Sequence, residues 1–249
     1  MILERTENPQ WLSNSYLLAD RPGGSGVLVD GNDTMEALLE RAEAEGVTVT
    51  HVLLTHPHGD HVAGIAEARE RLGGPKLVAH PAAAEEVADD VDETLEDGSR
   101  MTTGELEFEA IETPGHAAGH LAYLVNGVEL FTGDVLFKGT VGGTKAPGAS
   151  GFEDLKSSVM RLMELAPETR VHPGHREPTT IGDELEANPF VRVWRGLDEV
   201  GAESCTVWGQ EATLKLWAPD YDGGNKAWVL FRESGEEAIV GGSQVERDA

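Results

Sequence analysis

A short histidine-rich stretch, THPHGDH at residues 55–61, constrains this chain more than any other feature. It holds three of the nine histidines together with an aspartate. A β-rich apolar run, VTVTHVLL, precedes it, and a pattern typical of a helix, VAGIAEARERLGG, follows it. The stretch is either a polar surface loop or part of a metal site, and the rest of the sequence has to decide between the two.

The spacing within this stretch separates its polar side chains into two groups. Residues two apart in an extended segment point the same way, so His56 and His58 can reach one ion. Asp60 and His61 follow where the chain turns into the predicted helix, and they suit a second ion beside the first. Because imidazole dominates the candidate ligands, zinc or iron fits this chemistry better than calcium or magnesium.

Three later stretches supply further candidate ligands, each at the end of a predicted strand. TPGHAAGH contains His116 and His120, FTGD contains Asp134, and VHPGH contains His172 and His175. A glycine directly precedes His116, Asp134 and His175. Glycine permits backbone geometry that bulkier residues resist, which helps to aim the next side chain into a crowded site.

The charge balance limits the partners that we expect. The chain of 249 residues carries 19 basic and 45 acidic side chains, which gives a net charge of −26. A field of that sign repels phosphate backbones, so we expect no nucleic acid partner. An anionic substrate would need a local positive centre, such as a bound metal. The acidity is also compatible with adaptation to a salty cytoplasm.

Cysteine use and the N-terminal residues bear on the ligand type and the compartment. Cys205 is the only cysteine, so metal ligands have to be histidines and carboxylates. Residues 1–20 show neither the pattern of a signal peptide nor a long apolar stretch. We therefore expect a cytoplasmic protein that does not insert into a membrane.

The hydrophobic pattern predicts one large domain over residues 1–195 and a β-rich extension over residues 196–249. Strands alternate with helices in the first region, as in sheets covered by helices. Two of these helices are predicted to start at capping boxes, formed by Asp33 with Glu36 and by Ser150 with Glu153. The extension contains three of the five tryptophans, Trp208, Trp217 and Trp228, within short strand patterns.

The stretches THPHGDH, TPGHAAGH, TGD and PGH, in this order, resemble the metallo-β-lactamase fold superfamily, most of all its glyoxalase II-like hydrolases. The resemblance runs from about residue 13 to residue 193. It implies an α/β fold, a four-layer αββα sandwich with the site at one sheet edge. It also implies two divalent ions, for which we expect zinc first, with iron or a mixed zinc and iron pair as alternatives.

The resemblance also implies a role for each ligand. His56, His58 and His116 hold the first ion, Asp60, His61 and His175 hold the second, and Asp134 bridges the two. The remaining histidines of the motifs and strands are expected to pack or to form hydrogen bonds; they are His51, His80, His120 and His172.

The reaction implied is hydrolysis of an acyl bond by a hydroxide shared between the ions. Its substrate would be a small acyl-thiol or ester, first of all a thioester of the S-lactoyl-thiol kind, and Asp60 would orient the hydroxide or take its proton. Persulfide dioxygenases also resemble the family and imply one iron held by His56, His116 and Asp134. A non-catalytic metal-binding protein is a third alternative, although structural zinc sites are usually rich in cysteine.

One position departs from the members of the family that handle glutathione. These members carry a basic residue nine positions after the bridging aspartate, where this chain has Gly143. Lys138 and Lys145 lie nearby in the sequence. The tryptophan-containing extension also stands where those members have a helical glutathione-binding region. Both features argue against glutathione as the thiol and favour another thiol or an ester.

Overall fold

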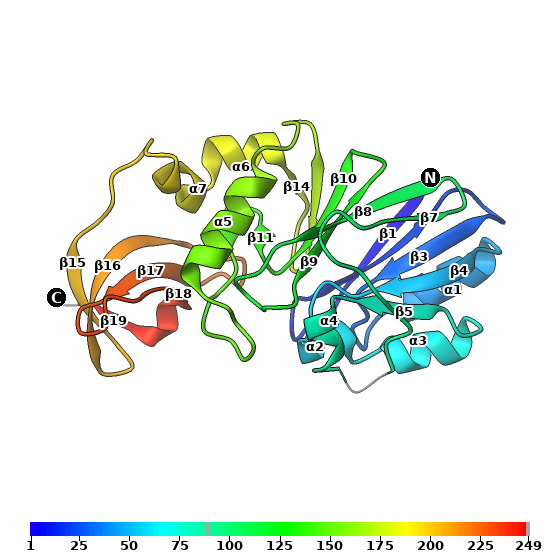
Figure 1. The fold of residues 1–249 in the computed structure, drawn as a ribbon, viewed down its shortest axis with the longest axis horizontal. Helices are drawn as coiled ribbons and strands as arrows, with labels where there is room; N and C mark the ends of the chain where they lie inside the picture. The colour runs from blue at the N-terminus through cyan, green and yellow to red at the C-terminus, as the bar shows by residue number, and fades with distance from the viewer. Residues whose placement is uncertain (88–89, 248–249) are drawn as a thin grey trace. The chain divides into compact units, whose positions relative to one another are not determined.

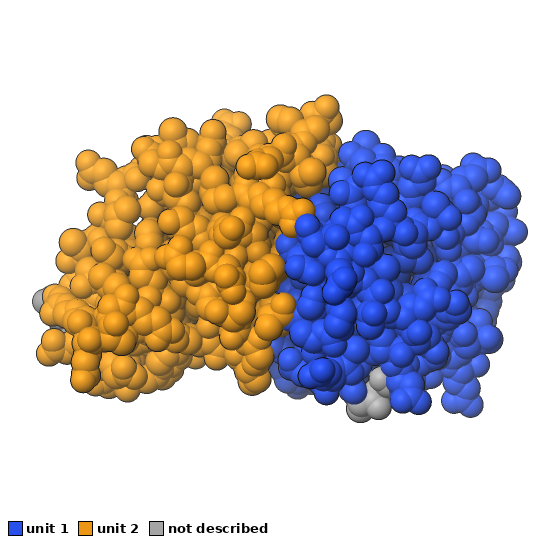
Figure 2. Space-filling view, viewed as in Figure 1, with its two compact units in different colours: residues 1–112, 119–134, 171–176 blue, residues 113–118, 135–170, 177–249 orange. Residues whose placement is uncertain are grey.

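The computed structural model describes residues 1–87 and 90–247, whose contacts form two compact units. Unit 1 comprises residues 1–112, 119–134 and 171–176, and unit 2 comprises residues 113–118, 135–170 and 177–249 (Figure 2). The chain passes repeatedly between them, so neither unit is one continuous segment. The division at residue 195 stays a prediction, and the last two residues of the predicted extension lie outside the described residues.

Unit 1 contains a six-stranded sheet in the order β1-β2-β3-β4-β5-β6 (Figure 1). Its strands are β1 (Ile2–Glu7), β2 (Asn14–Ala19), β3 (Ser25–Val29), β4 (Thr48–Leu53), β5 (Lys76–Ala79) and β6 (Glu93–Thr94). The first three pair antiparallel, and β3 to β6 pair parallel. Parallel neighbours need long crossovers, and these carry α1 (Glu36–Ala44), α2 (Gly59–Val62), α3 (Ile65–Arg71) and α4 (Pro81–Ala84).

Unit 1 contributes five strands to a second, six-stranded sheet, in the order β13-β10-β9-β8-β7. These strands are β7 (Arg100–Thr103), β8 (Leu106–Glu112), β9 (Leu121–Val125), β10 (Glu129–Gly133) and β13 (Arg170–Pro173). The hairpin between β9 and β10 turns at Asn126 and Gly127, which both have positive φ, as a tight Asn-Gly hairpin turn requires.

The strands of unit 1 contribute to two separate apolar cores. Leu17 of β2 packs in the core that holds Leu38 of α1 and Ile65 of α3. Its neighbour Leu18 faces the other way and packs in the core that holds Phe108 of the second sheet. Side chains alternate across a strand, so the first sheet is covered by helices on one face and by the second sheet on the other. This confirms the mixed α/β class.

Unit 2 holds the remaining helices and a five-stranded antiparallel sheet in the order β18-β17-β16-β15-β19. The helices are α5 (Phe152–Leu162), α6 (Ile181–Ala187), α7 (Pro189–Trp194) and the 3₁₀ turn η1 (Gly242–Gln244). The strands are β11 (Leu136–Phe137), β12 (Thr140–Val141), β14 (Thr179–Thr180), β15 (Glu203–Val207), β16 (Gln210–Pro219), β17 (Asn225–Phe231), β18 (Glu237–Gly241) and β19 (Val245–Arg247). Phe152 of α5 stacks on Trp228 of β17 at 5.2 Å, so the predicted β-rich extension is a packed sheet.

The helices start differently from the prediction. Helix α1 follows Met35 without a side-chain cap, because Asp33 instead accepts a hydrogen bond from Asn8. Helix α5 follows Gly151, again without a side-chain cap. Both capping-box predictions are therefore wrong. The helices are also short, and none within the described ranges is long and apolar enough to cross a membrane.

Candidate metal centre

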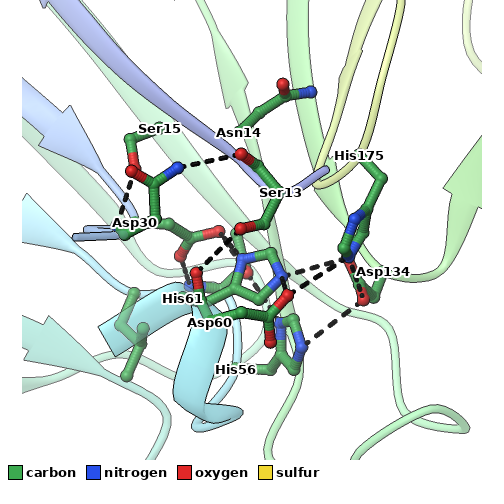
Figure 3. Close-up of polar contacts among 12 residues, drawn as sticks. Ser13, Asn14, Ser15, Asp30, His56, Asp60, His61, Asp134 and His175 are labelled. Atoms are coloured by element: carbon green, nitrogen blue, oxygen red, sulfur yellow. Dashed lines mark hydrogen bonds and ion pairs between the residues drawn. The ribbon is translucent and has the colours of Figure 1, made fainter. Parts of the chain in front are cut away.

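Six of the seven predicted ligands lie in unit 1, at or just beyond the ends of its strands. His56 and His58 follow β4, Asp60 and His61 belong to α2, Asp134 follows β10, and His175 follows β13. Figure 3 shows five of them, all but His58, converging from these elements. The buried strand β4 ends and α2 begins within a few residues, and this turn directs the two pairs of side chains differently.

Two glycines permit the close approach of the strand ends. The amide of Gly174 donates to the carbonyl of Gly133 at 2.7 Å, which joins the segments that carry His175 and Asp134. A Cβ on Gly174 would lie 2.1 Å from Oδ1 of Asp134. Gly133 has a φ of +44°, and a Cβ there would lie 2.6 Å from Nε2 of His120. Side chains at these positions would push the ligands apart.

The Asp134 carboxylate lies between the histidines. Oδ2 is 3.1 Å from Nε2 of His175 and 3.8 Å from Nε2 of His56, and Oδ1 is 3.4 Å from Nε2 of His61. Oδ2 of Asp60 lies 3.6 Å from Nε2 of His61 and 3.5 Å from Nε2 of His175. A tetrahedral ion with bonds of about 2.0–2.1 Å would separate its ligand atoms by about 3.3 Å. The spacing of these donor atoms therefore fits two ion positions that share Asp134.

The buried imidazole of His61 supports the same assignment. Its Nδ1 lies 2.9 Å from Oδ2 of Asp30, and its Nε2 faces Asp60 and Asp134. That Nε2 is buried and has no hydrogen-bond partner in the part of the chain that the structure describes. In the neutral form that a metal ligand takes, a ring that donates from Nδ1 presents a lone pair at Nε2 to two carboxylates. Positive charge between these atoms would remove the repulsion, and a divalent cation bound there would supply it.

The pKa values of the cluster indicate the same demand for positive charge. Burial acts to raise the pKa of Asp134, but His175, His61 and His56 outweigh it and hold that pKa well below its ordinary value. Burial acts to lower the pKa of His61, but Asp134 and Asp30 outweigh it and raise that pKa well above its ordinary value. The protein thus concentrates acidic and imidazole groups where they need a cation or protons.

Asp30 is a candidate functional residue that the sequence patterns did not single out. It is 2% exposed and accepts hydrogen bonds from the amide and the hydroxyl of Thr55, both at 2.8 Å. The Thr55 hydroxyl also lies 3.0 Å from Nδ1 of His56. Asp30 therefore orients His61 directly and His56 through Thr55. The signal was present in GVLVDG, where an aspartate follows an apolar strand as Asp134 does in LFTGD.

Replacing Asp30 with asparagine should weaken binding of the second ion about 10- to 100-fold, the usual effect of losing a partner that orients a metal-bound histidine. One carboxylate oxygen accepts from the Thr55 amide and the other accepts from the Thr55 hydroxyl and faces His61, so an amide would turn its NH₂ group toward one of these donors. Competition with a chelator measures the affinity. Asp20→Asn is the matched control, because Asp20 also follows a strand of unit 1, has a side chain only 1% exposed and accepts amide bonds away from the site. Equal affinity in both variants would contradict the role of Asp30.

Two further histidines support the site or the core. Nε2 of His120 accepts from the amide of Asp134 at 3.1 Å, and its ring stacks on that of His56 at 5.1 Å. His172 lies 2.8 Å from Oε2 of Glu129 and stacks on Phe131. These contacts are of the hydrogen-bonding and packing kind expected for both.

His116, the seventh predicted ligand, lies in unit 2. Its Nδ1 is 2.8 Å from the carbonyl oxygen of Gly143, and the residue is 9% exposed. The preceding Gly115 has a φ of +138°, and a Cβ there would lie 2.4 Å from the backbone of Leu155. Donation from Nδ1 to a carbonyl makes Nε2 the candidate ligand atom. The place of His116 in the first ligand set stays a prediction.

Comparisons with known proteins find similarity over about two thirds of the chain or more. The sequence profile of the Metallo-beta-lactamase superfamily matches residues 8–175. An uncharacterized protein of Mycobacterium tuberculosis is 34% identical, covering 72% of this chain and 92% of its own length. Hydroxyacylglutathione hydrolase of Rhodospirillum rubrum is also 34% identical, covering 71% of this chain and 81% of its own.

Solved structures show the same similarity. The structure of TTHA1623 in a di-iron-bound form has a TM-score of 0.65 and 35% identity, over 76% of this chain and 100% of that one. The structure of ETHE1 from Myxococcus xanthus has a TM-score of 0.68 and 29% identity, over 80% of this chain and 92% of that one.

Proposed function

The chain belongs to the metallo-beta-lactamase superfamily, and from that premise we propose that it is a binuclear hydrolase of acyl bonds, acting first on thioesters. The observation that carries the proposal is the second ligand set, in which Asp60, His61 and His175 meet around Asp134. A centre with one ion would leave Asp60, His61 and His175, which are buried or half-buried, without a metal to bind.

We assign the ligands as follows. His56, His58 and His116 would hold the first ion, Asp60, His61 and His175 would hold the second, and Asp134 would be shared by both. Zinc is the expected metal. Iron or a mixed pair is the alternative, which the similarity to the di-iron-bound structure supports.

Bound at these residues, two divalent ions would supply a nucleophilic hydroxide at neutral pH and a Lewis acid for the carbonyl oxygen of the substrate. The carboxylates among the ligands are only Asp60 and Asp134, so the ligands leave the centre with net positive charge. Such a centre would provide the local positive charge that an anionic substrate of this acidic protein would need. The side chain of Asp60 is 17% exposed against 8% for Asp134, so Asp60 is the better placed to accept a proton from the attacking water.

The substrate that fits is a small acyl-thiol or ester, and we propose a thiol other than glutathione. Position 143 contributes no cation, and Lys145 is engaged elsewhere, in an ion pair with Glu236 and over the ring of Phe231. The similarity to hydroxyacylglutathione hydrolase supports the thioester class. We also propose that the enzyme works in the cytoplasm and without nucleic acid or membrane partners.

A mononuclear iron persulfide dioxygenase is the second candidate. It would use His56, His116 and Asp134, and the 3.8 Å between His56 and Asp134 is compatible with it. It gives no role to the second ligand set, which is why we place it second.

The isosteric change Asp60→Asn separates the two candidates. It removes a carboxylate from the second set alone, so thioester turnover should fall about 100-fold or more, as for a lost ligand and proton acceptor. A one-iron dioxygenase would keep its activity. Hydrolysis of a thioester panel and oxygen uptake with a persulfide, measured on the same preparations, give the readout. Oxygen uptake unaffected by Asp60→Asn, without thioester turnover, would overturn the hydrolase proposal.

A further inference from the structure

The segment that carries His116 is held by elements of unit 2. The amides of Ser150 and Gly151 both donate to the carbonyl of Gly115, at 3.1 and 3.2 Å. The amide of Ala118 donates to the carbonyl of Gly148 at 2.8 Å. The orientation of the imidazole therefore depends on the loop 142–151, which is rich in glycine and needs anchoring to stay in one conformation.

That loop is anchored to the C-terminal sheet through Thr144. The amide of Thr144 donates to the carbonyl of Ile239, and the amide of Ile239 donates to Oγ1 of Thr144, both at 2.9 Å. Thr144 is 3% exposed and Ile239 is fully buried. Ile239 belongs to β18, the edge strand of its sheet, so these bonds satisfy backbone groups that an edge strand leaves unpaired. The adjacent ion pair of Lys145 with Glu236 is a second attachment.

We propose that the C-terminal sheet positions His116 for metal binding, with Thr144 as the positioning residue. Ile239 fixes Thr144, and Thr144 fixes the neighbouring Gly143, whose carbonyl lies 2.8 Å from Nδ1 of His116. The sheet begins after residue 175, where the match to the family profile ends. It therefore supplies to this chain a support for the first ion that the profile does not contain. The inference rests on the proposed function, since it takes His116 as a ligand.

The test compares Thr144→Val, which keeps the shape but loses the acceptor, with Thr144→Ser, which keeps the hydroxyl. Zinc affinity is measured by chelator competition, and the absorption spectrum of the cobalt-loaded protein reports ligand geometry, because zinc itself is d¹⁰. Thr144→Val should lower the affinity for the ion at His116 about 10-fold, which is the smaller end of the range for removing a residue that orients a metal ligand. It should also shift the absorption spectrum of the cobalt-loaded protein. Thr144→Ser should restore both readouts.

Three further variants make the outcome decisive. Val207→Ala weakens the same sheet at a buried position of β15, away from the contact with Thr144. It should lower the affinity much less than Thr144→Val, and an equal loss would contradict the role of Thr144 as the positioning residue. Glu236→Gln removes the exposed ion pair with Lys145 and should lower the zinc affinity about 2-fold, the size of effect expected for a surface ion pair. This variant tests the proposal if Thr144→Val does not fold. If His116→Ala lowers the zinc affinity while Thr144→Val and Glu236→Gln do not, the proposed positioning role is wrong. If His116→Ala has no effect, the proposed ligand set is wrong instead.

Discussion

Replacing Asp134 with alanine should abolish the binding of both ions. The carboxylate lies within 3.8 Å of His56, His61 and His175, and its Oδ1 and Oδ2 face different members of this group. The affinity of each site should fall by more than about 100-fold, which exceeds the effect of losing an orienting partner.

Elemental analysis after dialysis checks this, with close to no metal expected for Asp134→Ala. Glu129→Gln is the matched control, because Glu129 is a 1% exposed acid on β10, the strand that precedes Asp134, and it pairs with His172 rather than with the cluster. The control should keep its metal. An Asp134→Ala protein that retained both ions would show that this carboxylate does not bridge them.

Replacing His116 with alanine should remove the first ion and nearly all activity, while the second ion stays with Asp60, His61 and His175. The loss of a Lewis acid that contributes several kcal/mol to the transition state corresponds to about 1000-fold or more in rate. The fold should survive, because the segment is also held by the backbone bonds to Gly115 and Ala118.

The measurements for His116→Ala are metal content, circular dichroism and thioester turnover. His172→Ala provides a control of similar burial, 6% exposed against 9% for His116. It should lose some stability and keep both ions. Full activity in a His116→Ala protein that binds two ions would remove His116 from the site.

The parts of the fold that follow from local periodicity were predictable. Continuous apolar runs such as HVLL indicated a strand covered on both faces, and Val52 and Leu53 are indeed buried in different cores. The capping-box predictions were wrong because tertiary contacts override local spacing. Asp33 has a better partner in Asn8, which lies 25 residues away.

The candidate ligands were visible because histidine is rare in this chain and gathers at strand ends. Their supports were not visible, since they depend on contacts between distant residues. Asp30 reaches His61 across 31 residues, and its φ of +55° has no signature in the sequence. Ile239 and Thr144 are 95 residues apart, so no local pattern could link the C-terminal sheet to the loop beside His116.

The central claim is that two ions share Asp134 and together hydrolyse an acyl bond. The most direct test titrates zinc into the metal-free protein and follows metal content and thioester turnover in the same samples. The account predicts two ions per chain, with activity reaching its maximum only as the second ion binds. Full activity at one ion per chain would contradict it.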